Sequence, residues 1–147
     1  MESRTLTLRE LNRTTLDRQL LLKRTSDSVP QTMERLVGLQ AQALLAPFVG
    51  LWTRISKFSQ NDLADLIQNR TILKATMMRG TLHLVTAADY QHFRTALQPM
   101  LELGATAILK GRGPAMDKSI NPDDHFRDLV FRYLAAFGPA SVTDIQT

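Results

Sequence analysis

The chain has 147 residues, of which 44% are hydrophobic, and it contains no cysteine. This length suits one domain or two small ones, with enough apolar residues for a real core. The lack of cysteine excludes disulfide bonds and metal sites built on thiolates. The sequence has no apolar run long enough to cross a bilayer and no apolar segment typical of a signal peptide, so we expect a cytoplasmic protein.

The charge of the chain is positive and unevenly distributed. The net charge is +4; residues 1–79 carry +5 (12 Lys and Arg against 7 Asp and Glu) and residues 80–147 carry −1 (6 against 7). A basic half-chain suits a polyanionic partner, although many soluble proteins carry a similar charge. A membrane surface is a poorer candidate, because the basic N-terminal segment lacks the aromatic residues of interfacial helices.

The first predicted helix begins at Thr7-Leu8-Arg9-Glu10, where a hydroxyl and a carboxylate three residues on form a capping box. Poor helix formers cluster at Asn12–Thr15, so we expect a break or bend there. Leu16 and the run Leu20–Leu22 then predict an apolar stripe with a basic rim. The segment Thr25–Ser28 is expected to form a turn.

A second helix is predicted from the capping signal Ser28-Val29-Pro30-Gln31 to a glutamine pair, Gln40 and Gln42. One narrow stripe of this helix holds Gln40 together with Val29, Met33 and Leu36. Gln40 therefore occupies a position where an apolar residue is expected, and burying its amide unpaired would cost about 1–3 kcal/mol. Either the fold or a ligand must satisfy the amide.

The spacing of the two glutamines makes a geometric prediction. Residues two apart lie on nearly opposite faces of a helix but on the same face of a strand. The amides of Gln40 and Gln42 can therefore converge only if the helix ends near Gln40. Converging amides suit a base edge, a phosphate or a water; having no useful pKa, they cannot be conventional general bases, but they can orient a water. The alternative is a pair of amides that the fold itself satisfies.

Two more helices are predicted before the hydrophobic pattern changes from helical to strand periodicity. Residues 45–58 predict a third helix that holds the single tryptophan, and we assign Trp52 to the core rather than to a base-stacking platform. Ser59-Gln60-Asn61-Asp62 caps a fourth helix, which ends at Asn69-Arg70. Its inward residues are expected to be Leu63, Leu66 and Ile67.

A β-hairpin is predicted next, with strands at Ile72–Met78 and Thr81–Val85 around a short turn at Arg79-Gly80. Helices followed by a two-stranded hairpin are the order of a winged-helix unit. Strand alternation places Thr81 and His83 on one face of the hairpin, in line with Arg79. This face is either a solvated wing or a contact surface for DNA phosphates.

The C-terminal third predicts further helices. Thr86-Ala87-Ala88-Asp89 caps a helix that Pro99 should kink or split, and Gly111–Pro114 is expected to be a linker. Asn121-Pro122 starts a helix that stops at Gly138-Pro139, and Ser141-Val142-Thr143-Asp144 is another capping signal. We expect residues 1–114 to form a first winged-helix unit, and residues 115–147 the beginning of a second, truncated one.

The sequence lacks the usual signals for cofactors and metals. His83, His92 and His125 show no ligand spacing with one another or with carboxylates, so we predict no metal site. No phosphate-binding loop, dinucleotide fingerprint or nucleophile elbow occurs, so we predict no cofactor.

Several motifs together resemble one known family. They are Leu11-Asn12-Arg13, Gln19–Leu22, Gly38-Leu39-Gln40-Ala41-Gln42, Met78–Val85 with its Arg-Gly-Thr-Leu-His core, and Tyr133-Leu134 with Phe137–Ser141. This set is similar to the bacterial tandem winged-helix proteins that include the AlkZ-like and YcaQ-like DNA glycosylases. The similarity covers nearly the whole chain and implies a longer parent, with three winged-helix units around a DNA channel.

The resemblance implies an activity and a site. Family members with known activity remove alkylated purines, including crosslinked ones. Their catalytic motif is two polar residues that flank a small or aliphatic one, which here corresponds to Gln40 and Gln42. The resemblance implies that the pair would hold a water against the anomeric carbon of the target nucleotide in double-stranded DNA. The pair would also stabilise the oxocarbenium-like positive charge that develops on the sugar. We assign DNA contact to five residues, Arg79, Thr81, His83, Lys74 and Arg54.

Two alternatives stay open beside the glycosylase. The chain can be a non-catalytic winged-helix DNA-binding or regulatory module, or a fragment whose exposed apolar surface drives self-association.

Overall fold

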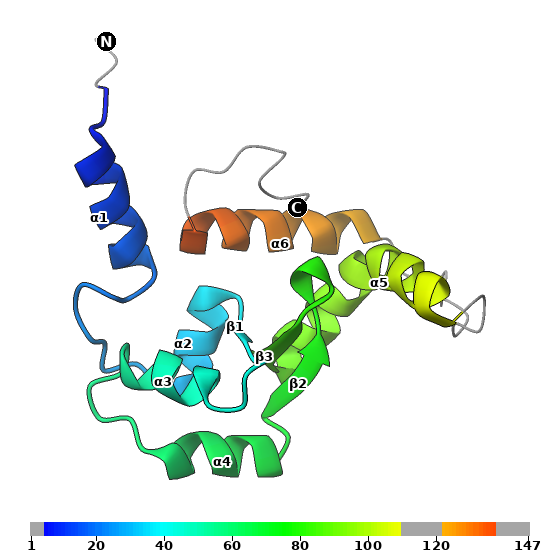
Figure 1. Cartoon of the computed structure of the whole chain (residues 1–147), viewed down its shortest axis with the longest axis horizontal. Coiled ribbons are helices and arrows are strands. Elements are labelled where there is room, and N and C mark those ends of the chain that lie inside the picture. The colour runs from blue at the N-terminus through cyan, green and yellow to red at the C-terminus, as the bar shows by residue number, and fades with distance from the viewer. Residues whose placement is uncertain (1–4, 110–121, 138–147) are drawn as a thin grey trace.

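The computed structural model describes residues 5–109 and 122–137 (Figure 1). Within these residues the elements are α1 (Leu8–Arg18), α2 (Val29–Leu36), β1 (Leu39–Gln40), α3 (Ala46–Trp52), α4 (Gln60–Gln68), β2 (Ile72–Thr76), the 3₁₀ turn η1 (Met78–Gly80), β3 (Leu82–Thr86), α5 (Ala87–Leu109) and α6 (Pro122–Phe137). The chain is mainly α with a small antiparallel sheet, as the sequence predicts.

The segment from α2 to β3 forms a winged-helix unit. Its order is helix, strand, two helices, strand, turn and strand, and the three strands pair antiparallel in the order β1-β3-β2. The predicted hairpin is confirmed, since β2 and β3 pair from Ile72 opposite Thr86 to Thr76 opposite Leu82. Strand β1 was not predicted, because two residues are too few for a periodic signal.

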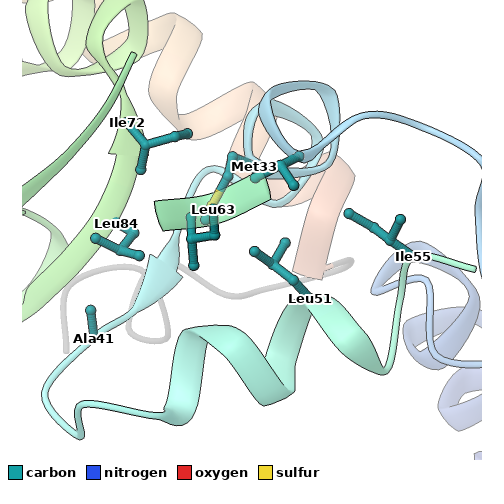
Figure 2. Close-up of a cluster of buried hydrophobic side chains, with 8 residues drawn as sticks. Met33, Ala41, Leu51, Ile55, Leu63, Ile72 and Leu84 are labelled. Carbon is teal, nitrogen blue, oxygen red and sulfur yellow. The ribbon is translucent and has the colours of Figure 1, made fainter. Parts of the chain in front are cut away.

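The sheet separates two hydrophobic cores. One face of the sheet packs on α2, α3 and α4 through Val29, Met33, Ala41, Leu51, Ile55, Leu63, Ile72 and Leu84 (Figure 2). The second cluster lies on the α5 and α6 side and contains Val37, Met77, Val85, Phe93, Leu97, Leu129 and Ala136. Leu84 and Val85 are adjacent in β3 and belong to different clusters, as strand alternation requires.

Helix α6 packs on the winged-helix unit. It lies across α2 and beside the start of α5, on the opposite side of the unit from α4 (Figure 1). Leu129 and Ala136 of α6 are buried in the second core. The side chain of Gln19, the residue that caps α1, donates to the carbonyl of Ala136 (2.8 Å). The domain division at residue 114 falls outside the described residues and stays a prediction.

Four of the predicted capping signals are confirmed by their hydrogen bonds. Complete capping boxes start α1 at Thr7, α2 at Ser28 and α4 at Ser59. The Thr86 hydroxyl accepts from the Asp89 N–H (3.1 Å) at the start of α5. The expected linker Gly111–Pro114 and the last capping signal, residues 141–144, lie outside the described residues.

The predicted break in the first helix is wrong. Helix α1 runs without interruption from Leu8 to Arg18. Within it, the hydroxyls of Thr14 and Thr15 donate to the carbonyls four residues earlier (2.8 and 3.1 Å). Such bonds pair the threonine hydroxyls within the helix and often bend it, so the expected bend, unlike the break, stays a prediction. The helix also ends before the leucine run, and Leu20 is buried with a positive φ of 57°.

The assignment of Trp52 to the core is wrong as well. Its side chain is 58% exposed, and the Arg24 guanidinium lies 4.6 Å from the centre of the Trp52 ring. Leu51, the preceding residue of α3, is fully buried in its place. Of the α4 residues expected inward, Leu63 is fully buried and Ile67 is 38% exposed. Helix α5 continues through Pro99, so this proline does not split the helix.

Candidate functional site

The glutamine pair follows a sharp turn that ends α2. Val37 and Gly38 both have positive φ angles (58° and 95°), and the Gly38 N–H donates back to the Met33 carbonyl (2.8 Å). A side chain on Gly38 would meet Val85 Cγ1 at 2.7 Å and the Leu84 carbonyl oxygen at 2.9 Å. Only glycine fits here, since it tolerates the positive φ and lets the chain pass closely over β3. The turn converts the helix into strand β1.

The helix therefore ends four residues earlier than the apolar stripe predicts. Val29, Met33 and Leu36 are buried, but Gln40 lies in β1 and is exposed. The expectation of a buried amide at Gln40 is wrong, because the turn at Val37 and Gly38 takes Gln40 off the helix.

The two amides converge, as the spacing predicts for an extended chain. Gln40 Nε2 donates to Gln42 Oε1 over 2.9 Å, and both side chains are exposed. Gln40 is paired with His83 across the β1–β3 ladder, and the adjacent Ala41 N–H donates to the Leu82 carbonyl (2.7 Å). Gln40 and His83 are thus a non-hydrogen-bonded pair, the type in which cross-strand side chains approach most closely.

The wing is the two-residue turn that the sequence predicts. Arg79 and Gly80 have φ angles of 58° and 66°, and the Thr81 N–H donates to the Met78 carbonyl (3.2 Å). Two successive positive φ values are typical of the type I′ turns that match the twist of a hairpin. Arg79 is exposed at the tip, and the Thr81 hydroxyl donates to the Met78 carbonyl (3.2 Å). The cation of Arg79 is therefore presented at the end of the hairpin.

His83 is half-buried and oriented by the backbone of its own strand. Its Nδ1 lies 2.9 Å from the Thr81 carbonyl oxygen, which can only accept a hydrogen bond. Nδ1 therefore carries a proton. Burial lowers the pKa of His83 below its ordinary value of 6.5; the bond to Thr81 opposes this and the nearby Arg79 adds to it. The neutral ring with Nδ1–H predominates at neutral pH.

Only part of the predicted site is brought together. His83 is paired with Gln40, and Thr81 precedes His83 on the same face of β3. Lys74 is paired with Leu84, so Lys74 shares the opposite face of the sheet. Lys74 and the glutamines therefore lie on different sides of the hairpin.

Arg54 holds the segment after α3 against the end of α1. Its Nε donates to the Gln19 carbonyl (2.8 Å) and its Nη1 to the Gly50 carbonyl (2.8 Å). Burial lowers the pKa of Arg54. These bonds give Arg54 a structural role that its position in the sequence does not reveal. The structure does not test the expected contact of Arg54 with DNA, and the engagement of its donors argues against that contact.

Helix α4 occupies the position of the recognition helix in a winged-helix unit, a role that was not predicted for this segment. It carries Asp62 and Asp65 and no Lys or Arg. The signal was present in the sequence, because the fourth helix precedes the hairpin directly. Its negative charge does not suit close approach to phosphates.

The order of helices and the three-stranded sheet define a winged-helix fold. The solved structure of the Streptomyces sahachiroi DNA glycosylase AlkZ is similar, with a TM-score of 0.68 and 17% sequence identity. The match covers 94% of this chain and 59% of that chain, so the present chain spans less than two thirds of AlkZ.

The sequence also matches a protein family. The family described as "DNA glycosylase AlkZ-like" matches residues 33–120, a range that includes Gln40, Gln42 and the whole wing. The chain belongs to the AlkZ-like DNA glycosylase family, as the motifs of the sequence indicate. A comparison with curated proteins gave no match.

Among residues 5–109 and 122–137, no helix is both long and apolar enough to span a bilayer. Over the same part of the chain, no three His, Asp or Glu side chains lie together as metal ligands would.

Proposed function

We propose that the protein acts as a DNA glycosylase that hydrolyses the N-glycosidic bond of alkylated or crosslinked purines in double-stranded DNA. The observation that carries the proposal is the convergence of Gln40 and Gln42, whose side-chain amides meet at 2.9 Å on the exposed end of β1. Membership of the AlkZ-like DNA glycosylase family supports it.

The amide pair offers suitable groups for holding a water. Once Gln40 Nε2 donates to Gln42 Oε1, the Gln40 oxygen and the Gln42 nitrogen have no hydrogen-bond partner among the described residues. One is an acceptor and the other a donor, so together they can bind one water. The Gln40 oxygen also places negative partial charge where an oxocarbenium-like cation would develop.

The alkylated purine of the proposed substrate is a good leaving group. A purine alkylated at N7 is already cationic, so breaking its bond to the sugar yields a neutral base. The reaction therefore does not require a strong acid to protonate the leaving base. Neutral amides that only position the attacking water can then be sufficient for hydrolysis.

The charge distribution favours a DNA path along the wing. Arg79 is exposed at the hairpin tip, whereas α4 has two carboxylates and no cation. In helix-turn-helix proteins the recognition helix enters the major groove, which an acidic helix would disfavour. We assign phosphate contact to Arg79 and Thr81, with Lys74 as a further contact from the opposite face of β2.

Base release tests the proposal. The substrate is duplex DNA containing N7-methylguanine, and release is compared for wild type, Gln40→Ala and Gln42→Ala. We expect each variant to be slower by about 10²-fold or more. Gln68→Ala is the matched control, because it removes an exposed glutamine of α4. Undiminished release by both site variants would rule out the catalytic role of the pair.

A second candidate is a DNA-binding or regulatory module without catalysis. The complete winged-helix unit from α2 to β3 favours it, since this fold is itself a DNA-binding unit. This candidate predicts DNA binding that survives both glutamine substitutions, with no base release by the wild-type chain. Self-association of the chain stays a prediction, which light scattering at increasing protein concentration tests.

A further inference from the structure

His83 has one ring nitrogen whose state the structure determines. Nδ1 is 2.9 Å from the Thr81 carbonyl and 3.4 Å from the Thr81 hydroxyl oxygen. The hydroxyl proton is directed to the Met78 carbonyl (3.2 Å), so the hydroxyl oxygen also serves as an acceptor. Both neighbours of Nδ1 accept, and the proton of a neutral ring must reside there. The second nitrogen, Nε2, is then an unprotonated acceptor.

The strand pairing places this ring beside the glutamines. Gln40 is the cross-strand partner of His83 in β1, and Ala75 is its partner in β2. Because Nδ1 bonds back to the strand's own backbone, Nε2 on the other side of the ring is directed away from it. Ala75 is small and apolar, so the polar neighbour of the ring across the sheet is Gln40.

Burial keeps this ring neutral. The pKa of His83 is lowered mainly because burial disfavours the imidazolium ion. Arg79 at the wing tip lowers it further, and the Thr81 hydrogen bond raises it. The ring is therefore neutral at neutral pH, and its Nε2 can accept a proton there.

The charged groups of the adjacent helix are mostly engaged elsewhere. In α5, Asp89 binds Arg132 and His92 binds Asp128, both in α6. Tyr90 and Arg94 are the other titratable residues in the first two turns of α5, and neither has a carboxyl group. No carboxylate of these two turns is therefore directed at His83 to favour its protonated form.

We propose that His83 is the proton acceptor of the site: its Nε2 takes the proton of the water that Gln40 and Gln42 hold. This inference rests on the proposed glycosylase function and supplies the base that two amides cannot provide. The ligand is an N7-alkylated purine nucleotide in DNA.

The step balances without a metal or cofactor. The water oxygen bonds to the sugar C1′ while the bond from C1′ to N9 breaks. The electron pair of that bond stays on the purine and neutralises its cationic ring. The water proton passes to His83 Nε2 and then to solvent, leaving an abasic site and a neutral alkylated base.

A purely structural role for His83 is the competing explanation, because Nδ1 holds the wing turn. The variant His83→Asn separates the two roles. The asparagine amide can donate to the Thr81 carbonyl in place of Nδ1, but it does not titrate and it has no group at the Nε2 position.

The experiment is the pH dependence of single-turnover release of N7-methylguanine from duplex DNA, from about pH 5 to 8. Spontaneous release without protein is subtracted at each pH. Wild type should lose rate on acidification, with an inflection below the ordinary histidine value of 6.5. His83→Asn should be slower by about 10²-fold at neutral pH and should lose the inflection. Gln40→Ala should be slower but keep it.

The outcomes are distinct. A His83→Asn variant with the rate and the inflection of wild type overturns the role of His83 and leaves the glycosylase function standing. A slower His83→Asn variant that keeps the inflection also overturns it, since the titrating group is then another one. No release by wild type at any pH overturns the proposed function, and the role of His83 with it.

Discussion

Arg132 of α6 holds both carboxylate oxygens of Asp89 in α5. Its Nη1 bonds Oδ1, its Nη2 lies 2.8 Å from Oδ2, and the same Nη2 donates to the Glu34 carbonyl in α2 (2.6 Å). The guanidinium also lies 4.9 Å from the centre of the Phe93 ring. Hydrogen bonding to Asp89 raises the pKa of Arg132. One side chain thus fastens α6 to two elements of the winged-helix unit.

Breaking this pair should destabilise the protein. The Asp89 side chain is only 9% exposed, so Arg132→Ala leaves a nearly buried carboxylate without its partner. We expect the free energy of unfolding to fall by about 3 kcal/mol in urea titrations. Arg132→Ala combined with Asp89→Ala should cost less than the sum of the single changes. Arg127→Ala, an exposed position of α6, is the control; additive costs would contradict the coupling.

The two glycines with positive φ should respond differently to alanine. Gly38→Ala introduces a methyl group 2.7 Å from Val85 Cγ1 and 2.9 Å from the Leu84 carbonyl oxygen, so we expect a loss of about 3 kcal/mol. In Gly80→Ala the new methyl group meets nothing within 4 Å. The free energy of unfolding should therefore fall by only about 1 kcal/mol, which is the cost of holding alanine in the left-handed conformation. Urea unfolding of both variants provides the comparison, and equal losses would mean that the close approach to β3 is unimportant.

Arg54 should matter for stability more than for DNA binding. Arg54→Ala removes the donors to the Gln19 and Gly50 carbonyls, and we expect the free energy of unfolding to fall by about 2 kcal/mol. DNA affinity, measured where the variant is fully folded, should change little. A variant of wild-type stability that binds DNA weakly would reverse this assignment.

Arg79 should show the opposite behaviour. Arg79→Asn removes the charge but suits the positive φ of 58°, because asparagine tolerates the left-handed region. We expect weaker binding to duplex DNA and a reduction of about one in the slope of log affinity against log salt. Fluorescence anisotropy between about 50 and 200 mM salt measures both quantities. An unchanged slope would show that Arg79 does not contact a phosphate.

The stability of the protein should depend on pH through His83. Its pKa is lower in the folded chain than the ordinary value of 6.5, so the unfolded chain binds more protons between these two values. The contribution of His83 to stability is therefore complete above pH 6.5 and is lost as the pH falls through the lowered pKa. In the variant His83→Asn this part of the pH profile should disappear, which urea unfolding across the acidic range can detect.

Local signals of the sequence were sufficient for much of the fold. Each capping box closes within four residues, so the hydroxyl at Thr7, Ser28 or Ser59 predicts a helix start wherever the helix later packs. The turn at Arg79-Gly80 is equally local. The convergence of Gln40 and Gln42 also followed from spacing, because extended residues two apart must share a face.

Tertiary structure decided what the local signals leave open. Strand β1 exists because Gly38 lets the chain pass over β3, which lies more than forty positions along the chain. Trp52 is exposed because Leu51 occupies the core position in α3, and a helical pattern of adjacent apolar residues does not tell which one faces inward. Lys74 and His83 lie on opposite faces because the register of β2 with β3 sets that relation. Short-range hydrogen bonds are determined by neighbours in the sequence, whereas facing and burial depend on which distant element packs against each side.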